Sequence, residues 1–205
     1  MTPKYMIVFI WFAWGVSWLI AANTMAAPTV KVAGFGREWP YRLLMGIGFA
    51  LIFMSLGQSS SPVPLPPLRE AILSFGFAQL WELPDAAQWG AVVLAIAGFA
   101  FAWWARLQLG GLWSSSVTRK EDHKLIDNGP YAFVRHPIYT GLLLGTIALV
   151  AVSGRMSAVI GFVLVVVGIF LKARLEERFL RDELGADVYG AYAKRVPMLV
   201  PGSPV

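Results

Sequence analysis

The hydrophobic pattern of this chain consists of long apolar runs, not of alternating apolar and polar positions. Each run is close to the lower end of the roughly 17 to 25 residues that a membrane-spanning helix needs. Tryptophans near the run ends extend such short spans, because an indole places its ring in lipid and its N–H near water. The pattern predicts an all-α polytopic membrane helix bundle of about five spans, at residues 6–22, 41–56, 89–105, 138–152 and 156–171.

The last two runs are separated only by Ser153, Gly154 and Arg155. So short a connection allows only a tight C-terminal hairpin of antiparallel helices. Small side chains let the backbones of neighbouring membrane helices approach closely. We expect this role within the hairpin for Gly141, Gly145, Ala148, Gly161 and Gly168.

Two segments leave the number of spans open. Residues 59–69 contain four prolines and are predicted to form a loop. The following apolar segment, 68–81, is short, which favours a re-entrant or interfacial position and leaves a sixth span as the alternative. Near the N-terminus, Lys4 and the run after it have the outline of a cleaved signal peptide, but the length and the tryptophan content favour a retained first span.

Composition supports a membrane protein. Of the 205 residues, 57% are hydrophobic and 14% are charged, far from the balance of a soluble domain. We expect a single membrane domain over residues 1–205, with N-terminal spans in 1–105 and a cofactor-binding catalytic half in 106–205. The chain has no cysteine, which excludes disulfides, thiolate catalysis and iron–sulfur clusters.

Charge indicates the orientation and the partners. The net charge is +5, but the basic residues cluster beside apolar runs, which favours membrane lipids over nucleic acid as partners. Nearly all lysines and arginines fall on one side of the predicted bundle. Since positive loops stay inside, that side, which carries 108–136 and the C-terminal tail, is predicted to face the cytoplasm.

Reactive side chains concentrate in two cytoplasmic stretches. The first contains His123 and His136, the only histidines of the chain. Pro137 suits the first turn of a helix, so the amides at that helix start, the helix dipole and Arg135 are predicted to attract a carboxylate or phosphate. Flat walls around the bound group would come from two tyrosines, Tyr131 and Tyr139. The simpler interpretation is that Arg135 fixes topology and the tyrosines belong to an interfacial belt.

The second stretch, 172–184, continues out of the last apolar run. Its oppositely charged residues have four-residue spacing, as in Lys172 and Glu176, which is typical of a solvated helix with weak ion pairs. However, Glu176 and Glu177 lie within two turns of the membrane, where an unpaired carboxylate is costly. A cationic ligand would give one of them a partner.

Motifs of soluble cofactor enzymes are missing from the sequence. The lone Gly34-Phe35-Gly36 has no βαβ context, and neither H-E-x-x-H nor G-x-S-x-G is present. Two histidines 13 positions apart are weak evidence for a metal site, so no metal is predicted.

Together, the two stretches resemble the isoprenylcysteine carboxyl methyltransferase and phospholipid methyltransferase family of integral membrane enzymes. The resemblance covers about residues 123–201 and rests on His123-x-Leu125-Ile126, Gly129-Pro130-Tyr131, Arg135-His136-Pro137-x-Tyr139-x-Gly141, the hairpin, the Glu176-Glu177 pair and tail residues such as Tyr189, Tyr192 and Pro197. It implies S-adenosylmethionine as the methyl donor, in a cofactor pocket at the cytoplasmic face. The implied donor contacts are Ser116, His123, Leu125, Ile126, Tyr131, Arg135, His136, Pro137 and Tyr139.

In that family an arginine after the last span lies beside the acceptor. Lys172 or Arg174 takes this position, depending on how the acidic run is aligned. We therefore predict that the catalytic residues are Lys172, Arg174, Glu176 and Glu177. The predicted acceptor is a lipophilic small molecule or a prenylated substrate that enters from the bilayer.

Two other functions remain as alternatives. NADPH-dependent membrane sterol or enone reductases have a similar Arg-His-Pro-x-Tyr region, but where they usually carry Asn and Asp this chain has Ile138 and Leu142. The second alternative is a non-enzymatic membrane binding protein built on the same scaffold.

Overall fold

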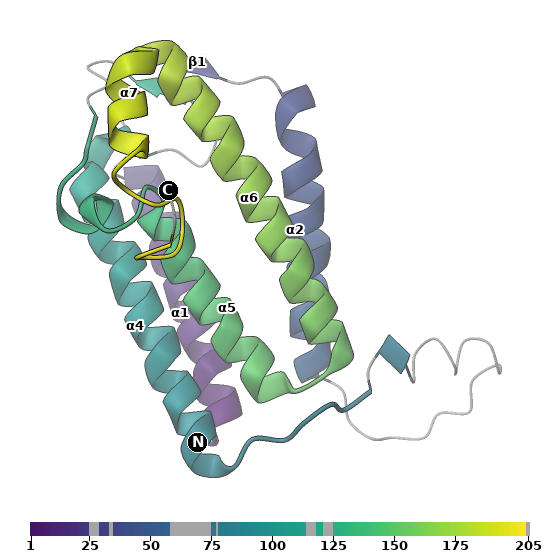
Figure 1. Cartoon of the computed structure of the whole chain (residues 1–205). Coiled ribbons are helices and arrows are strands. Elements are labelled where there is room, and N and C mark those ends of the chain that lie inside the picture. The colour runs from purple at the N-terminus through teal and green to yellow at the C-terminus, as the bar shows by residue number, and fades with distance from the viewer. Residues whose placement is uncertain are drawn as a thin grey trace.

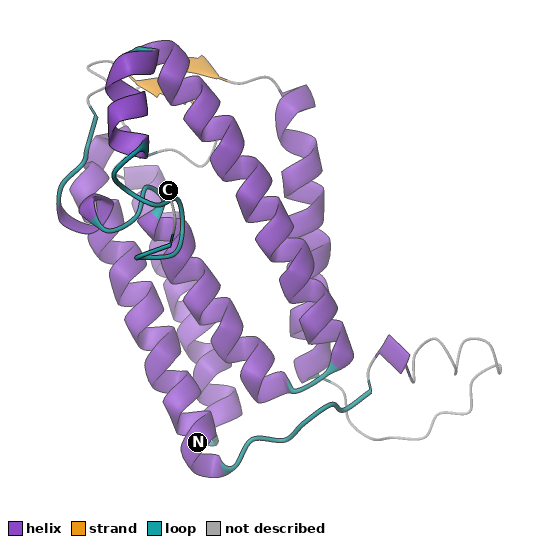
Figure 2. Cartoon of the chain, in the orientation of Figure 1, coloured by secondary structure: helices purple, strands orange, loops and turns teal. Residues whose placement is uncertain are grey.

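The computed structural model describes residues 1–24, 29–32, 35–57, 75–76, 78–113, 118–120 and 125–203. Helices make up most of it (Figure 2). The bundle consists of α1 (Pro3–Thr24), α2 (Phe35–Leu56), α4 (Asp85–Leu109), α5 (Pro137–Ser153) and α6 (Met156–Leu184) (Figure 1). The shorter helices are α7 (Ala186–Ala193) and the 3-10 turns η1 (Gly110–Leu112) and η2 (Gly129–Ala132). The predicted all-α membrane bundle is confirmed.

The helices of the bundle are long enough, or nearly long enough, to span a membrane. The helices α1, α2, α4 and α6 are long and apolar enough to cross a membrane, whereas α5 has 17 residues. At 1.5 Å per residue α5 is roughly 25 Å long, shorter than a hydrocarbon core of about 30 Å. The last helix is longer than its apolar run, because α6 continues to Leu184 and carries the 172–184 stretch on the same rigid element.

The helices form two closely packed groups. Figure 1 shows α2 beside α6 and, next to this pair, α4 packed with α5 and α1. A Cβ added to Gly98 would lie 2.7 Å from the Gly141 carbonyl oxygen, and one added to Gly48 would lie 2.6 Å from the Gly161 carbonyl oxygen. Both contacts are too short for a side chain, so α4 meets α5 and α2 meets α6 with their backbones almost touching.

This arrangement corrects one prediction about the hairpin. The small residues were expected to bring α5 and α6 together, but Gly141 and Gly145 face α4, and Gly161 and Gly168 face α2. The hairpin itself is confirmed, with Gly154 at φ 60° in its turn, a left-handed backbone that favours glycine.

Hydrogen bonds at the end of the bundle that contains this turn hold the end of α2 and the residues before α4 in place. The Ser55 and Ser153 hydroxyls are 2.6 Å apart, which fixes the end of α2 beside the end of α5. The Leu80 N–H donates to the Gly154 carbonyl over 2.7 Å, and the Trp81 indole N–H donates to the Ala151 carbonyl over 2.8 Å. The described residues 78–81 therefore lie against this turn shortly before α4 begins, and the choice between an interfacial segment and a sixth span stays open.

A small antiparallel sheet was not predicted. Strand β1 (Thr29–Val32) pairs with β2 (Thr118–Lys120), with Thr29 opposite Lys120 and Val32 opposite Thr118. The pairing joins the connection between α1 and α2 to the connection that precedes η2.

Candidate active site

The candidate site begins where the chain enters α5. Pro137 occupies the first turn, where its missing N–H costs no hydrogen bond, and His136 is the cap residue. The backbone N–H groups of Arg135 and His136 donate to the carbonyls of Pro197 and Met198, over 2.8 and 3.0 Å. The C-terminal segment therefore occupies the two amides that precede the helix, whereas the anion site at the amides of the helix start stays a prediction.

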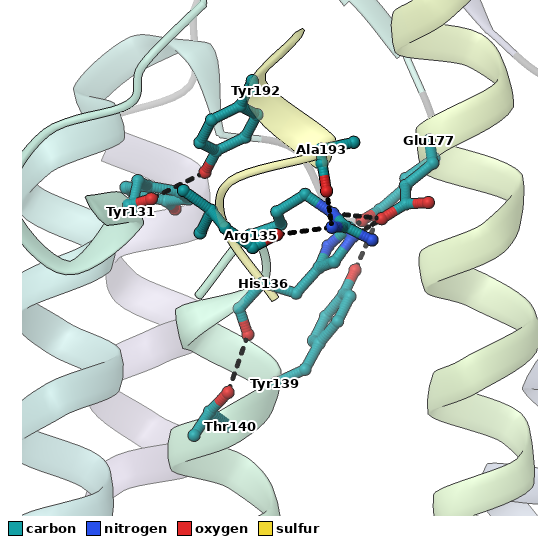
Figure 3. A network of polar contacts seen from close by, with 10 residues as sticks. Tyr131, Arg135, His136, Tyr139, Thr140, Glu177, Tyr192 and Ala193 are labelled. Atoms are coloured by element: carbon teal, nitrogen blue, oxygen red, sulfur yellow. Dashed lines mark hydrogen bonds and ion pairs between the residues drawn. The ribbon is translucent and has the colours of Figure 1, made fainter. Parts of the chain in front are cut away.

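Arg135 joins three parts of the chain. Its Nε donates to Glu177 Oε1 over 2.7 Å, and its Nη1 donates to the carbonyls of Ala193 and Val196 over 2.9 and 2.5 Å (Figure 3). Its side chain is only 9% exposed, so its charge is compensated inside the protein by Glu177. The guanidinium thereby connects the start of α5 to α6 and to the tail.

Further contacts hold the tail against the same region. The Thr140 hydroxyl donates to the Leu199 carbonyl over 2.6 Å, and the Tyr192 hydroxyl donates to the Tyr131 carbonyl over 2.7 Å. Thr140 was missed by the sequence reasoning, although it lies within the Arg-His-Pro-x-Tyr region. Its partner is a backbone carbonyl distant in sequence, and no local pattern reveals such a contact.

The two adjacent glutamates of α6 face different neighbours, because successive helical residues are about 100° apart. Gly168, Lys172 and Glu176 follow each other at four-residue spacing, and Gly168 packs against α2. Glu177 instead reaches Arg135 at the start of α5. Both carboxylates thus reach the beginning of α5, Glu177 at Arg135 and Glu176 at Tyr139.

His136 lies between the two carboxylates. Its Nε2 is 3.4 Å from Glu177 Oε1, and its Nδ1 is 3.5 Å from Glu176 Oε2. Burial lowers the pKa of His136, but the hydrogen bonds and charges of Glu176 and Glu177 outweigh it and raise this pKa above its ordinary value of 6.5. The protonated imidazole donates from both ring nitrogens, which suits a cation held between two anions.

Glu176 also contacts Tyr139 and Lys172. It accepts a hydrogen bond of 2.5 Å from the Tyr139 hydroxyl, and Lys172 Nζ lies 3.9 Å from the same oxygen. The Tyr139 ring stacks on the His136 ring at a centroid distance of 5.4 Å. Glu176 is 22% exposed against 4% for Glu177, so Glu176 is the carboxylate of the pair that a ligand can reach.

Tyr131 and Pro137 are buried behind this cluster. The Tyr131 hydroxyl donates to the Ala105 carbonyl of α4 over 3.4 Å. Burial raises the pKa of Tyr131 and of Tyr192, so both remain neutral hydroxyl donors. Leu125 packs against the cluster of Tyr189, Tyr192 and Val196, and Ile126 is half-buried beside it in the chain.

The sequence left Lys172 and Arg174 as alternative cations beside the acceptor. The structure places them in different surroundings. Lys172 is 14% exposed and sits beside Glu176 and Tyr139. Arg174 is exposed, with its Cζ 5.0 Å from the centre of the Phe170 ring. The geometry favours Lys172 as the cation of the site.

Two predicted donor contacts, Ser116 and His123, lie outside the described residues. Across the described ranges, no group of three or more His, Asp or Glu side chains is placed to hold a metal ion.

The sequence reasoning also missed the contribution of α2. Tyr41 is buried, and its ring centre lies 5.7 Å from Lys172 Nζ. The resemblance did not extend to the N-terminal half, so nothing in the sequence marked a tyrosine at the beginning of an apolar run as part of the site.

Comparison with known proteins covers the part of the chain that contains this cluster. Residues 91–182 match the isoprenylcysteine carboxyl methyltransferase (ICMT) family. The matched segment contains α5, most of α4 and most of α6, and thus Arg135, His136, Glu176 and Glu177. The resemblance predicted from the sequence is confirmed.

Individual relatives match the same half of the chain. A protein named Protein-S-isoprenylcysteine O-methyltransferase B from Arabidopsis thaliana is 35% identical over 42% of this chain and 43% of its own length. Protein-S-isoprenylcysteine O-methyltransferase from Schizosaccharomyces pombe is 34% identical over 47% of this chain and 42% of its own length. Cobalt-zinc-cadmium resistance protein CzcN from Cupriavidus metallidurans is 29% identical over 45% of this chain and 43% of its own length. The chain thus matches less than half the length of each relative.

Proposed function

We propose, from the ICMT-family match of residues 91–182, that this chain is an integral membrane methyltransferase. In this proposal it uses S-adenosylmethionine to methylate the carboxylate of a prenylated or similarly lipophilic acceptor. The observation that carries the proposal is that the matched segment contains a cluster of Arg135, His136, Glu176 and Glu177 held together by hydrogen bonds and ion pairs. The names of the Arabidopsis and fission yeast relatives describe them as isoprenylcysteine O-methyltransferases, and both relatives match less than half of this chain.

The residues fit a donor of this chemistry. S-adenosylmethionine, when bound, supplies a methyl group on a positively charged sulfur, which leaves as a neutral thioether. The stacked rings of His136 and Tyr139 offer flat faces that tolerate a cationic group such as this sulfur. In the proposal these residues hold the donor together with Tyr131, Leu125, Ile126, Ser116 and His123.

Arg135 supports the residues that hold the donor. Its guanidinium fixes Glu177 and the tail, so Glu177 and His136 keep one orientation. Such orientation accelerates a transfer, because an attacking oxygen must lie in line with the bond that breaks. We assign Arg135 to positioning, since its hydrogen bonds are made within the protein.

A carboxylate acceptor needs no general base. An α-carboxyl group has a pKa of about 3.5, so it is ionised and nucleophilic at neutral pH. The site must then orient the acceptor and exclude water. We propose that Lys172 orients the carboxylate while the apolar tail lies among the helices in the bilayer.

The membrane orientation is the remaining part of the proposal. The N-terminal end of α5, the C-terminal end of α6 and the tail lie together at one end of the bundle (Figure 1). This end carries most of the lysines and arginines, which supports a cytoplasmic site.

Binding of nucleotide ligands to the detergent-purified protein tests the proposal. Calorimetry with S-adenosylmethionine, S-adenosylhomocysteine and NADPH should show saturable binding of the two adenosyl ligands and none of NADPH. The variant His136→Ala/Tyr139→Ala should lose this binding, whereas Asp85→Asn, at the opposite end of the bundle, should keep it. Binding of NADPH alone would identify a reductase, and binding of none of the three would contradict a methyltransferase.

A further inference from the structure

Tyr41 of helix α2 places a hydroxyl group beside the site. This hydroxyl has no role in the proposed transfer of the methyl group. Tyr41 is 4% exposed, and no described residue is placed to accept a hydrogen bond from its hydroxyl. The Arg42 guanidinium, with its Cζ 5.7 Å from the ring centre, is placed to donate to the Tyr41 oxygen, but a guanidinium has no acceptor atom, so the O–H of Tyr41 still lacks an acceptor. Arg42 itself donates to Glu38 over 2.6 Å.

An unpartnered buried hydroxyl destabilises a protein, because it loses its hydrogen bonds to water without replacing them. Native proteins hold few such groups, and each one calls for an explanation. A ligand that supplies the missing acceptor atom is one such explanation, provided that the hydroxyl borders a binding site.

The position of Tyr41 meets this condition. Close packing of α2 on α6 at Gly168 brings the Tyr41 backbone against α6, and Lys172 follows one turn later on the same face. Lys172 Nζ lies 5.7 Å from the centre of the Tyr41 ring and 5.4 Å from that of Tyr139. The ammonium is thus held between rings from two helices, at the edge of the partly exposed Glu176.

We propose that Tyr41 is an acceptor-binding residue whose hydroxyl donates a hydrogen bond to the carboxylate that Lys172 attracts. This inference rests on the proposed function and extends the acceptor site to α2, outside the segment that matches the ICMT family. The acceptor carboxylate would supply the hydrogen-bond acceptor that the Tyr41 hydroxyl lacks in the protein alone.

The pairing of Tyr41 with Lys172 makes the site selective for substrate over product. A carboxylate accepts a charge-assisted hydrogen bond and balances the ammonium, and such bonds are roughly twice as strong as neutral ones. The methyl ester formed by transfer carries no charge and accepts more weakly. The site should therefore bind the acid more tightly than the ester, which favours release of the product.

Binding of an acid and its ester tests this assignment without relying on turnover. The probes are N-acetyl-S-farnesylcysteine and its methyl ester, titrated into the full-length protein in detergent. The wild-type protein should bind the acid at least about tenfold more tightly than the ester, as expected for one charge-assisted hydrogen bond. Tyr41→Phe should remove most of this preference, with an unchanged or higher Tm of the ligand-free protein because a buried hydroxyl without an acceptor is gone.

Ser157→Ala is the matched control. Ser157 also has a buried hydroxyl without a hydrogen-bond partner among the described residues, but it lies at the opposite end of α6. Its removal should leave the acid-to-ester ratio unchanged. Lys172→Gln should lower the ratio as Tyr41→Phe does.

An acid-to-ester ratio in Tyr41→Phe equal to that of the wild type would overturn the assignment. So would an equal loss of both ligands together with a lower Tm, because it would show a purely structural hydroxyl. Methyl transfer from labelled S-adenosylmethionine, measured on the same preparations, reports separately on the proposed function. Transfer with an unchanged ratio contradicts only the role of Tyr41, whereas a Tyr41-dependent ratio without any transfer supports the acceptor site and contradicts the methyltransferase.

Discussion

At the scale of single residues, the two adjacent glutamates of α6 are predicted to have different roles, Glu177 in stability and donor binding and Glu176 in turnover. Glu177 is almost fully buried between Arg135 and His136, so Glu177→Gln leaves buried cations without their anion. We expect a loss of about 3 kcal/mol in the free energy of unfolding and loss of donor binding. Glu176 is partly exposed and positions Tyr139 and Lys172, so Glu176→Gln should reduce turnover at least tenfold with little loss of donor affinity.

Thermal unfolding, donor titration and turnover of both variants check this difference. Equal Tm losses in the two variants would contradict the assignment of Glu177 to the interior of the site. An unchanged rate in Glu176→Gln would remove Glu176 from the chemistry.

His136 makes the stability of the site depend on pH. The carboxylates of Glu176 and Glu177 raise the pKa of His136 above 6.5 in the folded protein. A raised pKa in the folded state means that the stabilisation is fully present below the pKa of the unfolded chain and is lost as pH rises through the folded value. The difference in Tm between wild type and His136→Gln should therefore be largest near pH 6 and shrink toward pH 9, and a difference that grows with pH would contradict the bridging imidazolium.

At the scale of helices, glycine contacts fix the spacing on which the site depends. A Cβ on Gly48 would lie 2.6 Å from a backbone oxygen of α6, whereas a Cβ on Gly46, on the same helix, would meet nothing within 4 Å. Gly48→Ala should therefore destabilise the protein by about 1 to 3 kcal/mol through overpacking, and Gly46→Ala should not destabilise it. Because α2 carries Tyr41, Gly48→Ala should also weaken acceptor binding more than donor binding, which titration of both ligands measures.

The same helices show what the sequence could and could not predict. The apolar runs predicted the five long helices, because lipid solvation selects for apolar length alone. The start of α2 at Phe35 was missed, since residues 36–40 include charged residues and a proline. Small residues indicated close helix contacts but not their partners, because a helical pattern identifies a face and not the helix that covers it.

In the candidate site, too, residues of local motifs could be predicted from the sequence, whereas contacts between distant parts of the chain could not. His136, Tyr139 and the two glutamates were selected from local motifs, and the structure brings them together. The hydrogen bonds of Arg135 to Ala193 and Val196 were not foreseen, because they end on backbone carbonyls that any sequence provides. Tyr41 was missed because its relation to Lys172 exists only after α2 and α6 have packed.

At the scale of the whole molecule, the site is assembled where three helix ends meet the tail. The beginning of α2, the beginning of α5 and the polar end of α6 lie together, and Asp85 at the start of α4 lies at the opposite end (Figure 1). Most of the basic residues that the structure describes lie at the same end as the site, so we propose, from the positive-inside rule, that this end faces the cytoplasm.

Single cysteines test this orientation directly, because the chain has none of its own to interfere. Asp187 in α7 and Asp85 in α4 are both exposed and mark the two ends of the bundle. A membrane-impermeant maleimide should label Asp85→Cys in intact cells and Asp187→Cys only in inside-out vesicles. Labelling of Asp187→Cys in intact cells would place the cluster around His136 outside the cytoplasm, where a cytoplasmic methyl donor does not reach it, and would require another function for the site.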